Sequence, residues 1–143
     1  MDPKLKDRVL REAEAHDSDS VLENSYQLKN RFSHIWSYPS KIEIESYCDS
    51  LARKMEGSHV LDYGCGWGEG SFKYISAGAS VTGIDISKKF IDKANESAIK
   101  NNINPDRYQF MVMDAHNLEF DNETFDYVIG FGIIHHLEQD KAL

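Results

Sequence analysis

A strand-like segment that runs into a series of glycines is the feature that most restricts the fold of this chain. The apolar pair Val60 and Leu61 is followed by glycines at positions 64, 66, 68 and 70, and a helical pattern comes next. Glycine accepts positive φ angles, and its missing side chain lets a ligand approach the backbone. The segment therefore predicts a sharp strand-to-helix turn that forms a shelf for a ligand.

Short apolar runs alternate with helical patterns around this turn. The apolar runs cover residues 59–61, 80–84, 109–113 and 127–130. Such alternation is typical of parallel strands joined by crossover helices. We therefore expect an α/β fold, namely a Rossmann-like doubly wound sheet preceded by N-terminal helices.

The helix between the second and third runs has clear limits. Ser87 is a suitable N-cap, Asn101 closes the helix, and its apolar face contains Phe90, Ile91, Ala94 and Ala98. A further helix is expected to begin at Ile134. Because the chain ends at Leu143, we expect the C-terminal strands of a complete sheet to be missing, leaving an edge open to self-association.

The first 56 residues show a different pattern and are expected to form a helical arm or lid, ahead of a truncated ligand-binding domain over residues 57–143. One amphipathic helix is predicted over residues 3–16, with an apolar face of Leu5, Val9, Leu10 and Ala13. A second is predicted between Pro39 and Gly57, with an apolar face of Ile44, Tyr47, Cys48, Leu51 and Met55.

Composition restricts the partners. The 143 residues carry a formal net charge of −8, which disfavours a surface that binds nucleic acid phosphates. The sequence contains no long apolar window typical of a membrane span. Cys48 and Cys65 have no metal-binding spacing, so we expect no metal. We expect a cytoplasmic protein.

The glycine spacing distinguishes two kinds of adenosine cofactor. A dinucleotide site requires G-x-G-x-x-G, but reading from Gly64 places Glu69 at the third glycine position, and reading from Gly66 places Ser71 there. Glu69 at the start of a helix would also repel a pyrophosphate. An NAD(P)-dependent oxidoreductase is therefore disfavoured.

The order D-x-G-C-G-x-G over residues 62–68 resembles the first motif of class I S-adenosylmethionine-dependent methyltransferases. The resemblance implies that S-adenosylmethionine is the cofactor and that the loop faces its methionine part. Asp62 matches the acid that acts, often through water, on the cofactor's ammonium group. The loop positions implied in cofactor binding are Gly64, Cys65, Gly66 and Gly68.

Two later acids agree with this resemblance. Asp85 ends the second apolar run, at the offset expected for an acid that binds ribose hydroxyls, although an Asp there is also a common turn residue. Ile86 is expected beside it. The resemblance implies that Asp114 binds the adenine amino group and that the Ala115 backbone meets the ring, although Asp is also frequent in turns.

The fourth run and the segment after it are expected to face the transferred methyl group. The resemblance includes the segment from Phe125 to Gly130, and Gly130 is expected at the cofactor. The sequence His135-His136-Leu137 resembles small-molecule methyltransferases of this family in which a histidine after the fourth strand can act as a base on a hydroxyl acceptor. The resemblance makes His135 and His136 candidate bases, and histidine titrates near neutrality, which suits that role. The alternative is that one of them caps or packs a helix and the other is solvated. A metal pair is disfavoured, because adjacent side chains on a helix point about 100° apart.

The aromatic segment between Tyr26 and Tyr38 has two interpretations. It forms a lid in which Tyr26, or another of Arg31, Trp36 and Tyr38, reaches the cofactor carboxylate, or it packs on the sheet. The function predicted overall is methyl transfer to a small-molecule hydroxyl, amine or carbon. The alternative is a non-catalytic module that binds the cofactor or a partner.

Overall fold

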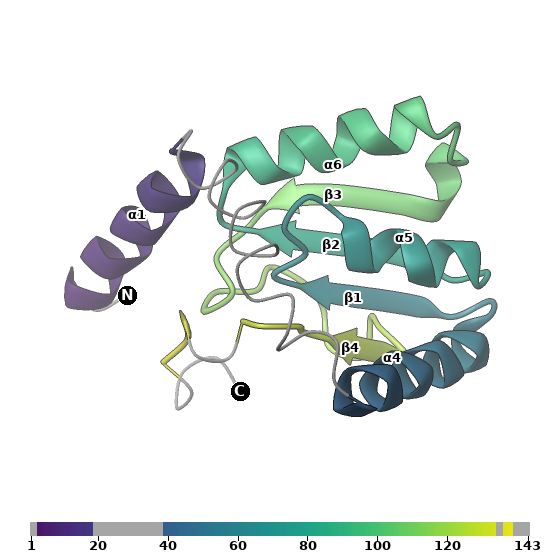
Figure 1. Ribbon diagram of the computed structural model, residues 1–143. Coiled ribbons are helices and arrows are strands. Elements are labelled where there is room, and N and C mark those ends of the chain that lie inside the picture. Colours follow the sequence, from purple (N-terminus) through teal and green to yellow (C-terminus); the bar gives the residue numbers. More distant parts are fainter. Residues whose placement is uncertain (1–2, 19–38, 134–135, 139–143) are drawn as a thin grey trace.

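Four parallel strands form one sheet in the order β3-β2-β1-β4 (Figure 1). The computed structural model describes residues 3–18, 39–133 and 136–138. The strands are β1 His59–Tyr63, β2 Ser80–Asp85, β3 Tyr108–Val112 and β4 Tyr127–Ile129. All four predicted strands are confirmed, and β1 extends two residues beyond its expected end.

The helices occupy two places around this sheet (Figure 1). Three pack on one face, namely α4 Pro39–Ala52 with the 3₁₀ turn Arg53–Met55, α5 Glu69–Ser76 and α6 Lys88–Lys100. Another of the described helices, α1 Pro3–Asp17, lies at the carboxyl ends of the strands. A second 3₁₀ turn, Pro105–Arg107, precedes β3. The predicted cap of α6 is confirmed, since the Ser87 hydroxyl accepts a hydrogen bond of 3.1 Å from the backbone N–H of Phe90.

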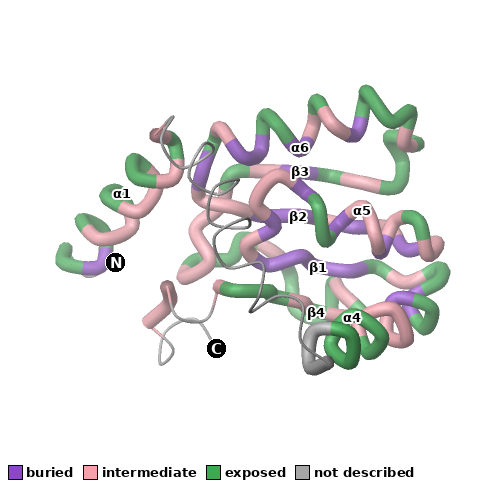
Figure 2. The backbone as a smooth tube through the Cα atoms, in the orientation of Figure 1, coloured by how far each residue is buried: buried purple, intermediate pink, exposed green. Residues whose placement is uncertain are grey.

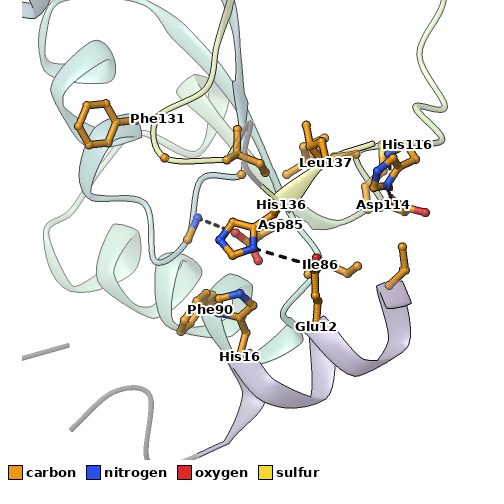
Figure 3. A pocket seen from close by; sticks show the side chains of 18 residues that line it. Glu12, His16, Asp85, Ile86, Phe90, Asp114, His116, Phe131, His136 and Leu137 are labelled. Carbon is orange, nitrogen blue, oxygen red and sulfur yellow. Dashed lines mark hydrogen bonds and ion pairs between the residues drawn. The ribbon is translucent and has the colours of Figure 1, made fainter. Parts of the chain in front are cut away.

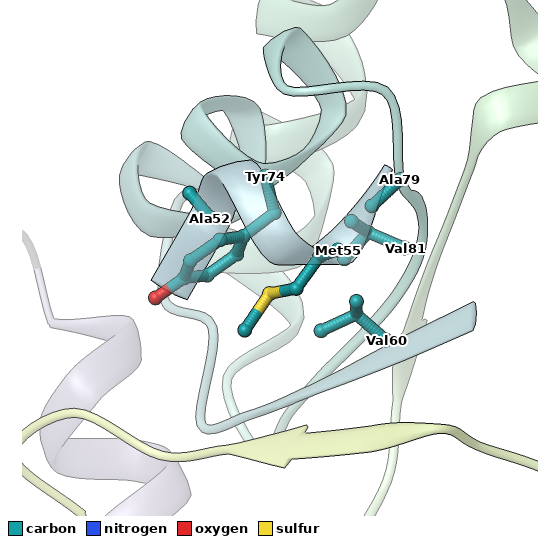
Figure 4. Close-up of a cluster of buried hydrophobic side chains, with 6 residues drawn as sticks. All are labelled: Ala52, Met55, Val60, Tyr74, Ala79 and Val81. Atoms are coloured by element: carbon teal, nitrogen blue, oxygen red, sulfur yellow. The ribbon is translucent and has the colours of Figure 1, made fainter. Parts of the chain in front are cut away.

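The core is built on the two central strands, where burial is concentrated (Figure 2). Between the sheet and the helices α4 and α5 lies one apolar cluster, formed by Ala52, Met55, Val60, Tyr74, Ala79 and Val81 (Figure 4). On the opposite face, Leu61, Tyr63 and Ile84 are covered by the connection from β3 to β4. The chain thus crosses both faces of the sheet, as doubly wound topology requires.

Two predicted apolar faces are partly wrong. On α1, Leu5 is buried but Leu10 is 54% exposed, because the helix docks with the face that carries Leu5 and Val9. On α4, Ile44 is 53% exposed, because only the last part of the helix contacts the sheet. Amphipathic spacing indicates a helix, but it does not indicate how much of the face finds a neighbour.

The outer edge of the sheet is open in the part of the chain that is described. No described strand pairs with the far side of β4, and Val128 and Phe131 are 65% and 72% exposed. The helix expected from Ile134 falls partly outside the described residues. None of the described helices has the length and apolarity needed to cross a membrane.

Gly83 in β2 is expected to be intolerant of any side chain. A Cβ there would lie 2.6 Å from the Phe110 ring and 2.9 Å from the Cys65 sulfur. Gly83→Ala should therefore lower the free energy of unfolding by about 1–3 kcal/mol, measured by urea denaturation. In Gly70→Ala, the matched control on α5, the new Cβ meets its nearest atom at 3.6 Å, so stability should be kept or raised. Equal stability of the two variants would contradict the tight packing at Gly83.

Candidate functional site

A cavity opens at the carboxyl ends of the strands, where β1 lies between β2 and β4 (Figure 3). Open α/β sheets bind ligands at this position, where the strand order reverses. Its walls come from α1, the glycine loop, the end of β2, and the segments that follow β3 and β4. The principal lining residues are Glu12, His16, Gly64, Gly66, Asp85, Ile86, Phe90, Asp114, Ala115, His116, Ile133 and His136.

The glycine loop has the predicted shape. Gly64, Gly66 and Gly68 have φ angles of 78°, 53° and 84°, a left-handed conformation that favours glycine. A Cβ on Gly64 would lie 2.2 Å from Ile133, so this glycine is also required by the close approach of the segment after β4. Gly64 and Gly66 line the cavity, whereas Gly68 caps the start of α5.

The Cys65 side chain turns away from the cavity. It is buried with Ala94 and Phe110 in the cluster under α6. Burial raises the pKa of the Cys65 thiol, so the sulfur is held in its neutral, unreactive form. Its part in the loop is to pack the turn against the sheet.

Asp62 is buried beneath the loop and does not line the cavity. Its Oδ2 accepts a hydrogen bond of 2.5 Å from the Ser71 hydroxyl at the start of α5. Burial raises the pKa of Asp62, the Ser71 hydrogen bond opposes this shift, and the nearby charge of Asp85 adds to it. The carboxylate therefore holds β1 to α5, and its role toward an ammonium group remains a prediction.

Asp85 lies at the end of β2 and faces the cavity. Its two carboxylate oxygens accept hydrogen bonds of 2.9 Å from the backbone N–H groups of Gly66 and Ser87. Asp85 is thus a turn residue, which was one of the two interpretations of the sequence, and it also lines the cavity, together with Ile86. Carboxylate oxygens have further lone pairs, so these two bonds leave Asp85 able to accept from a ligand.

Asp114 follows β3 and has one satisfied and one unsatisfied oxygen. Its Oδ1 accepts from the backbone N–H of His116 and lies 2.9 Å from the Nδ1 of that ring. The His116 Nε2 accepts from the backbone N–H of Glu138 at 3.1 Å, so Nδ1 carries the proton and donates to Asp114. The Oδ2 of Asp114 is buried and has no hydrogen-bond partner. The neighbouring Ala115 carbonyl accepts from the Tyr63 hydroxyl.

The segment after β4 brings His136 to the cavity, close to α1. Its Nδ1 lies 3.8 Å from a carboxylate oxygen of Glu12, and its backbone carbonyl accepts a hydrogen bond of 2.8 Å from Arg8. Gly130 does not line the cavity, and a Cβ there would meet Ile133 at 2.9 Å. The other candidates in these regions, His135, Tyr26, Arg31, Trp36 and Tyr38, lie outside the described residues.

The sequence missed several lining residues. Val9, Glu12 and His16 all reach the cavity from α1, on one face of the helix. Val9 belongs to the predicted apolar face of α1, and Glu12 and His16 continue that face at spacings of three and four residues, but an apolar pattern does not include these two polar residues. His116 was also missed, because a histidine four residues after a strand has no distinguishing pattern.

The fold and the strand-end cavity define a class of protein. Both are those of class I S-adenosylmethionine-dependent methyltransferases, with the glycine turn after β1 and acids after β2 and β3. The family model described as a methyltransferase domain matches residues 60–143, more than half of the chain. The chain belongs to this methyltransferase family.

Individual known proteins agree with this assignment. The chain is 38% identical over 82 residues to a 27-O-demethylrifamycin SV methyltransferase of Amycolatopsis mediterranei, covering 57% of this chain and 30% of the relative. It is also 38% identical over 94 residues to a Methanocaldococcus jannaschii methyltransferase named for the large ribosomal RNA, covering 63% of this chain and 23% of the relative. The chain thus spans less than a third of the length of these two relatives.

A solved structure shows the same fold over a longer stretch. The magnesium protoporphyrin IX methyltransferase of Synechocystis PCC 6803, solved with bound S-adenosylmethionine, superposes with a TM-score of 0.66. The match covers 94% of this chain and 66% of that one, at 22% identity. At this identity the likeness concerns the fold alone.

The buried carboxylate of Asp62 should make stability depend on pH. Its raised pKa means that the native state releases this proton less readily than the unfolded state. Asp62 therefore disfavours folding increasingly as pH rises above the ordinary value of 3.8, and fully once pH exceeds the raised value. Asp62→Asn cannot ionise. It should be more stable than wild type near neutral pH, and the difference should shrink as pH falls toward 3.8, the ordinary pKa of an aspartate.

Urea denaturation at several pH values measures this difference. Ser71→Ala is the companion variant, because it removes the hydrogen bond that opposes the shift and should enlarge the pH dependence in the wild-type Asp62 background. A difference between Asp62→Asn and wild type that stays constant with pH would contradict the raised pKa.

Proposed function

We propose that this protein binds S-adenosylmethionine in the strand-end cavity and transfers its methyl group to a small-molecule acceptor. The observation that carries the proposal is the buried, unpartnered Oδ2 of Asp114, a residue that lines the same cavity as Asp85. Buried polar atoms are rarely left without a hydrogen bond. An adenosine group supplies donors for both acids, in its amino group and its ribose hydroxyls.

Each part of the cofactor has residues that suit it. The adenine amino group would donate to Asp114 Oδ2, beside the Ala115 backbone, and the ribose hydroxyls would donate to Asp85, with Ile86 alongside. The backbone of Gly64 and Gly66 would meet the methionine part. Cys65, Gly68 and Gly130 would support the cavity wall at the methionine part from behind.

Two predicted contacts complete the cofactor site. Asp62 would act through water on the ammonium group of the cofactor. Tyr26 remains the predicted contact from the N-terminal arm.

When bound, the cofactor supplies a methyl group on a sulfonium with a good leaving group. The chain's own residues then need to orient the acceptor, exclude water and take up a proton where the acceptor loses one. His136 is the described residue placed for the proton, since it lines the cavity and Glu12 lies beside its ring. His135 stays a second candidate for this role.

The small-molecule acceptor is supported by the rifamycin relative and by the charge of the chain. Binding to nucleic acids is driven by cationic side chains that neutralise phosphates and release counterions, and a net charge of −8 disfavours such binding. The relative named for ribosomal RNA makes nucleic acid the alternative acceptor to test.

Three further predictions, on domain division, cellular location and self-association, belong with this proposal. We propose that residues 1–56 act as an arm or lid over a cofactor domain at residues 57–143, since α1 lines the cavity. A cytoplasmic location is supported by the free cysteines Cys48 and Cys65. Self-association through the exposed edge of β4 is supported by the exposed Val128 and Phe131.

Binding of the cofactor should raise the thermal unfolding midpoint of the chain. A ligand that binds only the folded state stabilises it by about 2.7 kcal/mol at 100 times its Kd. We expect S-adenosylmethionine and S-adenosylhomocysteine to raise the midpoint in differential scanning fluorimetry, and NADH to leave it unchanged. No rise with either sulfur cofactor would overturn the proposed function.

Transfer itself is followed with methyl-labelled S-adenosylmethionine and a panel of phenols, primary amines and ribosomal RNA. Label in a phenol or amine supports the small-molecule acceptor, and label in RNA alone contradicts it. Cofactor binding with no transfer to any of them would favour the non-catalytic module.

Asp114→Asn should change which base the site prefers. The amide oxygen should stay where His116 donates, so the amide nitrogen replaces Oδ2 and faces the ligand. An N–H group in that place repels the adenine amino group but suits the O6 of hypoxanthine. Calorimetry should show S-adenosylhomocysteine binding about 10-fold or more weaker, and S-inosylhomocysteine binding tighter than to wild type. Equal weakening of both ligands would contradict the assigned role.

A further inference from the structure

Two buried side-chain polar atoms lack a hydrogen-bond partner in the described part of the chain, and both belong to residues that line the same cavity. One is Asp114 Oδ2, to which the proposed function gives the adenine amino group. The other is Nδ1 of His16, near the end of α1. Since buried polar atoms are normally satisfied, the second atom also calls for a ligand group.

The end of α1 is anchored at the start of α6. Asp17 accepts hydrogen bonds from the Ser87 hydroxyl and, at 3.1 Å, from the backbone N–H of Lys89. Asp17 thus adds an acceptor at the N-terminus of α6, where backbone donors have no partner within the helix. These bonds join the last turn of α1 to the turn between β2 and α6, which carries Asp85 and Ile86.

The ring of His16 is held between two other rings (Figure 3). Its centroid lies 5.6 Å from that of Phe90, with the planes tilted by 57°, and 5.8 Å from that of His136, with the planes at 72°. One tilted and one edge-to-face contact restrict the orientation of the imidazole. The imidazole is therefore positioned before any ligand arrives.

We propose that His16 binds a ribose hydroxyl of the nucleoside cofactor, together with Asp85. This inference rests on the proposed function. Each ribose hydroxyl can donate one hydrogen bond and accept others, and Asp85 can only accept. A hydroxyl that donates to Asp85 keeps lone pairs for a donor, and a neutral or charged imidazole supplies an N–H group. The N-terminal helix is therefore part of the nucleoside site.

The test compares His16→Phe with His16→Asn. Phenylalanine keeps the ring contacts and removes both nitrogens, whereas asparagine keeps a polar amide near the position of Nδ1. Glu14→Gln is the matched control on the same helix, because Glu14 is exposed and does not line the cavity. Affinities for S-adenosylhomocysteine, methylthioadenosine and 2′,3′-dideoxy-methylthioadenosine are measured by calorimetry.

We expect His16→Phe to weaken the binding of S-adenosylhomocysteine and of methylthioadenosine by the same factor, about 5- to 20-fold, because both ligands contain the ribose hydroxyls. The dideoxy compound should bind wild type and His16→Phe equally. His16→Asn should stay within about threefold of wild type, and Glu14→Gln should match it. Without ligand, His16→Phe should be at least as stable as wild type, because an unpaired buried nitrogen is removed.

The other outcomes separate two failures. If wild type does not bind S-adenosylhomocysteine, the proposed function fails. If wild type binds and His16→Phe binds equally well, the role of His16 is overturned. Weakening of S-adenosylhomocysteine without weakening of methylthioadenosine would place His16 at the amino-acid part of the ligand and would also overturn the ribose assignment.

Discussion

The Asp85 carboxylate connects two strand-to-helix turns that are separate in the sequence. One oxygen accepts from Gly66 in the glycine loop, and the other accepts from Ser87 at the start of α6. The Ser87 hydroxyl in turn caps α6 and donates to Asp17 at the end of α1. One acid therefore fixes the loop, the start of α6 and, through Ser87, the docking of α1. The shape of the cavity depends on this set of hydrogen bonds.

A second set of contacts closes the cavity from the other side. His116 joins Asp114 after β3 to Glu138 after β4, and Arg8 joins α1 to the carbonyl of His136. The cavity wall is thus assembled from five segments that are distant in the sequence. Because the rings and acids already hold fixed orientations, a nucleoside would meet acceptors that need little rearrangement, and this limits the entropic cost of binding.

The site also shows that some stability is given up for binding. Asp62 is buried with a raised pKa, and Asp114 Oδ2 and His16 Nδ1 are buried without hydrogen bonds. Each of these groups disfavours the unliganded fold, and apolar or neutral replacements would avoid the cost. Their concentration around one cavity is typical of a binding site, where local rules of stability are broken in favour of a ligand.

The order of strands and helices, the glycine turn and the acids at the ends of β2 and β3 could be predicted from the sequence. These features depend on spacing within short segments, and the periods of strands and helices are visible there. The burial of Asp62 beneath the loop was not predictable, since it depends on how α5 packs against β1.

The contributions of α1 and His116 to the cavity wall are visible only in the tertiary structure. The Arg8 contact joins residues 128 positions apart, and the Asp17 contact joins residues 70 apart. No local pattern encodes such a contact. The apolar spacing of α1 included Leu10, which is exposed, and left out the polar Glu12 and His16, which lie on the docked face. The chain's local chemistry specifies a nucleoside shelf at the strand ends, and long-range packing determines which side chains complete it.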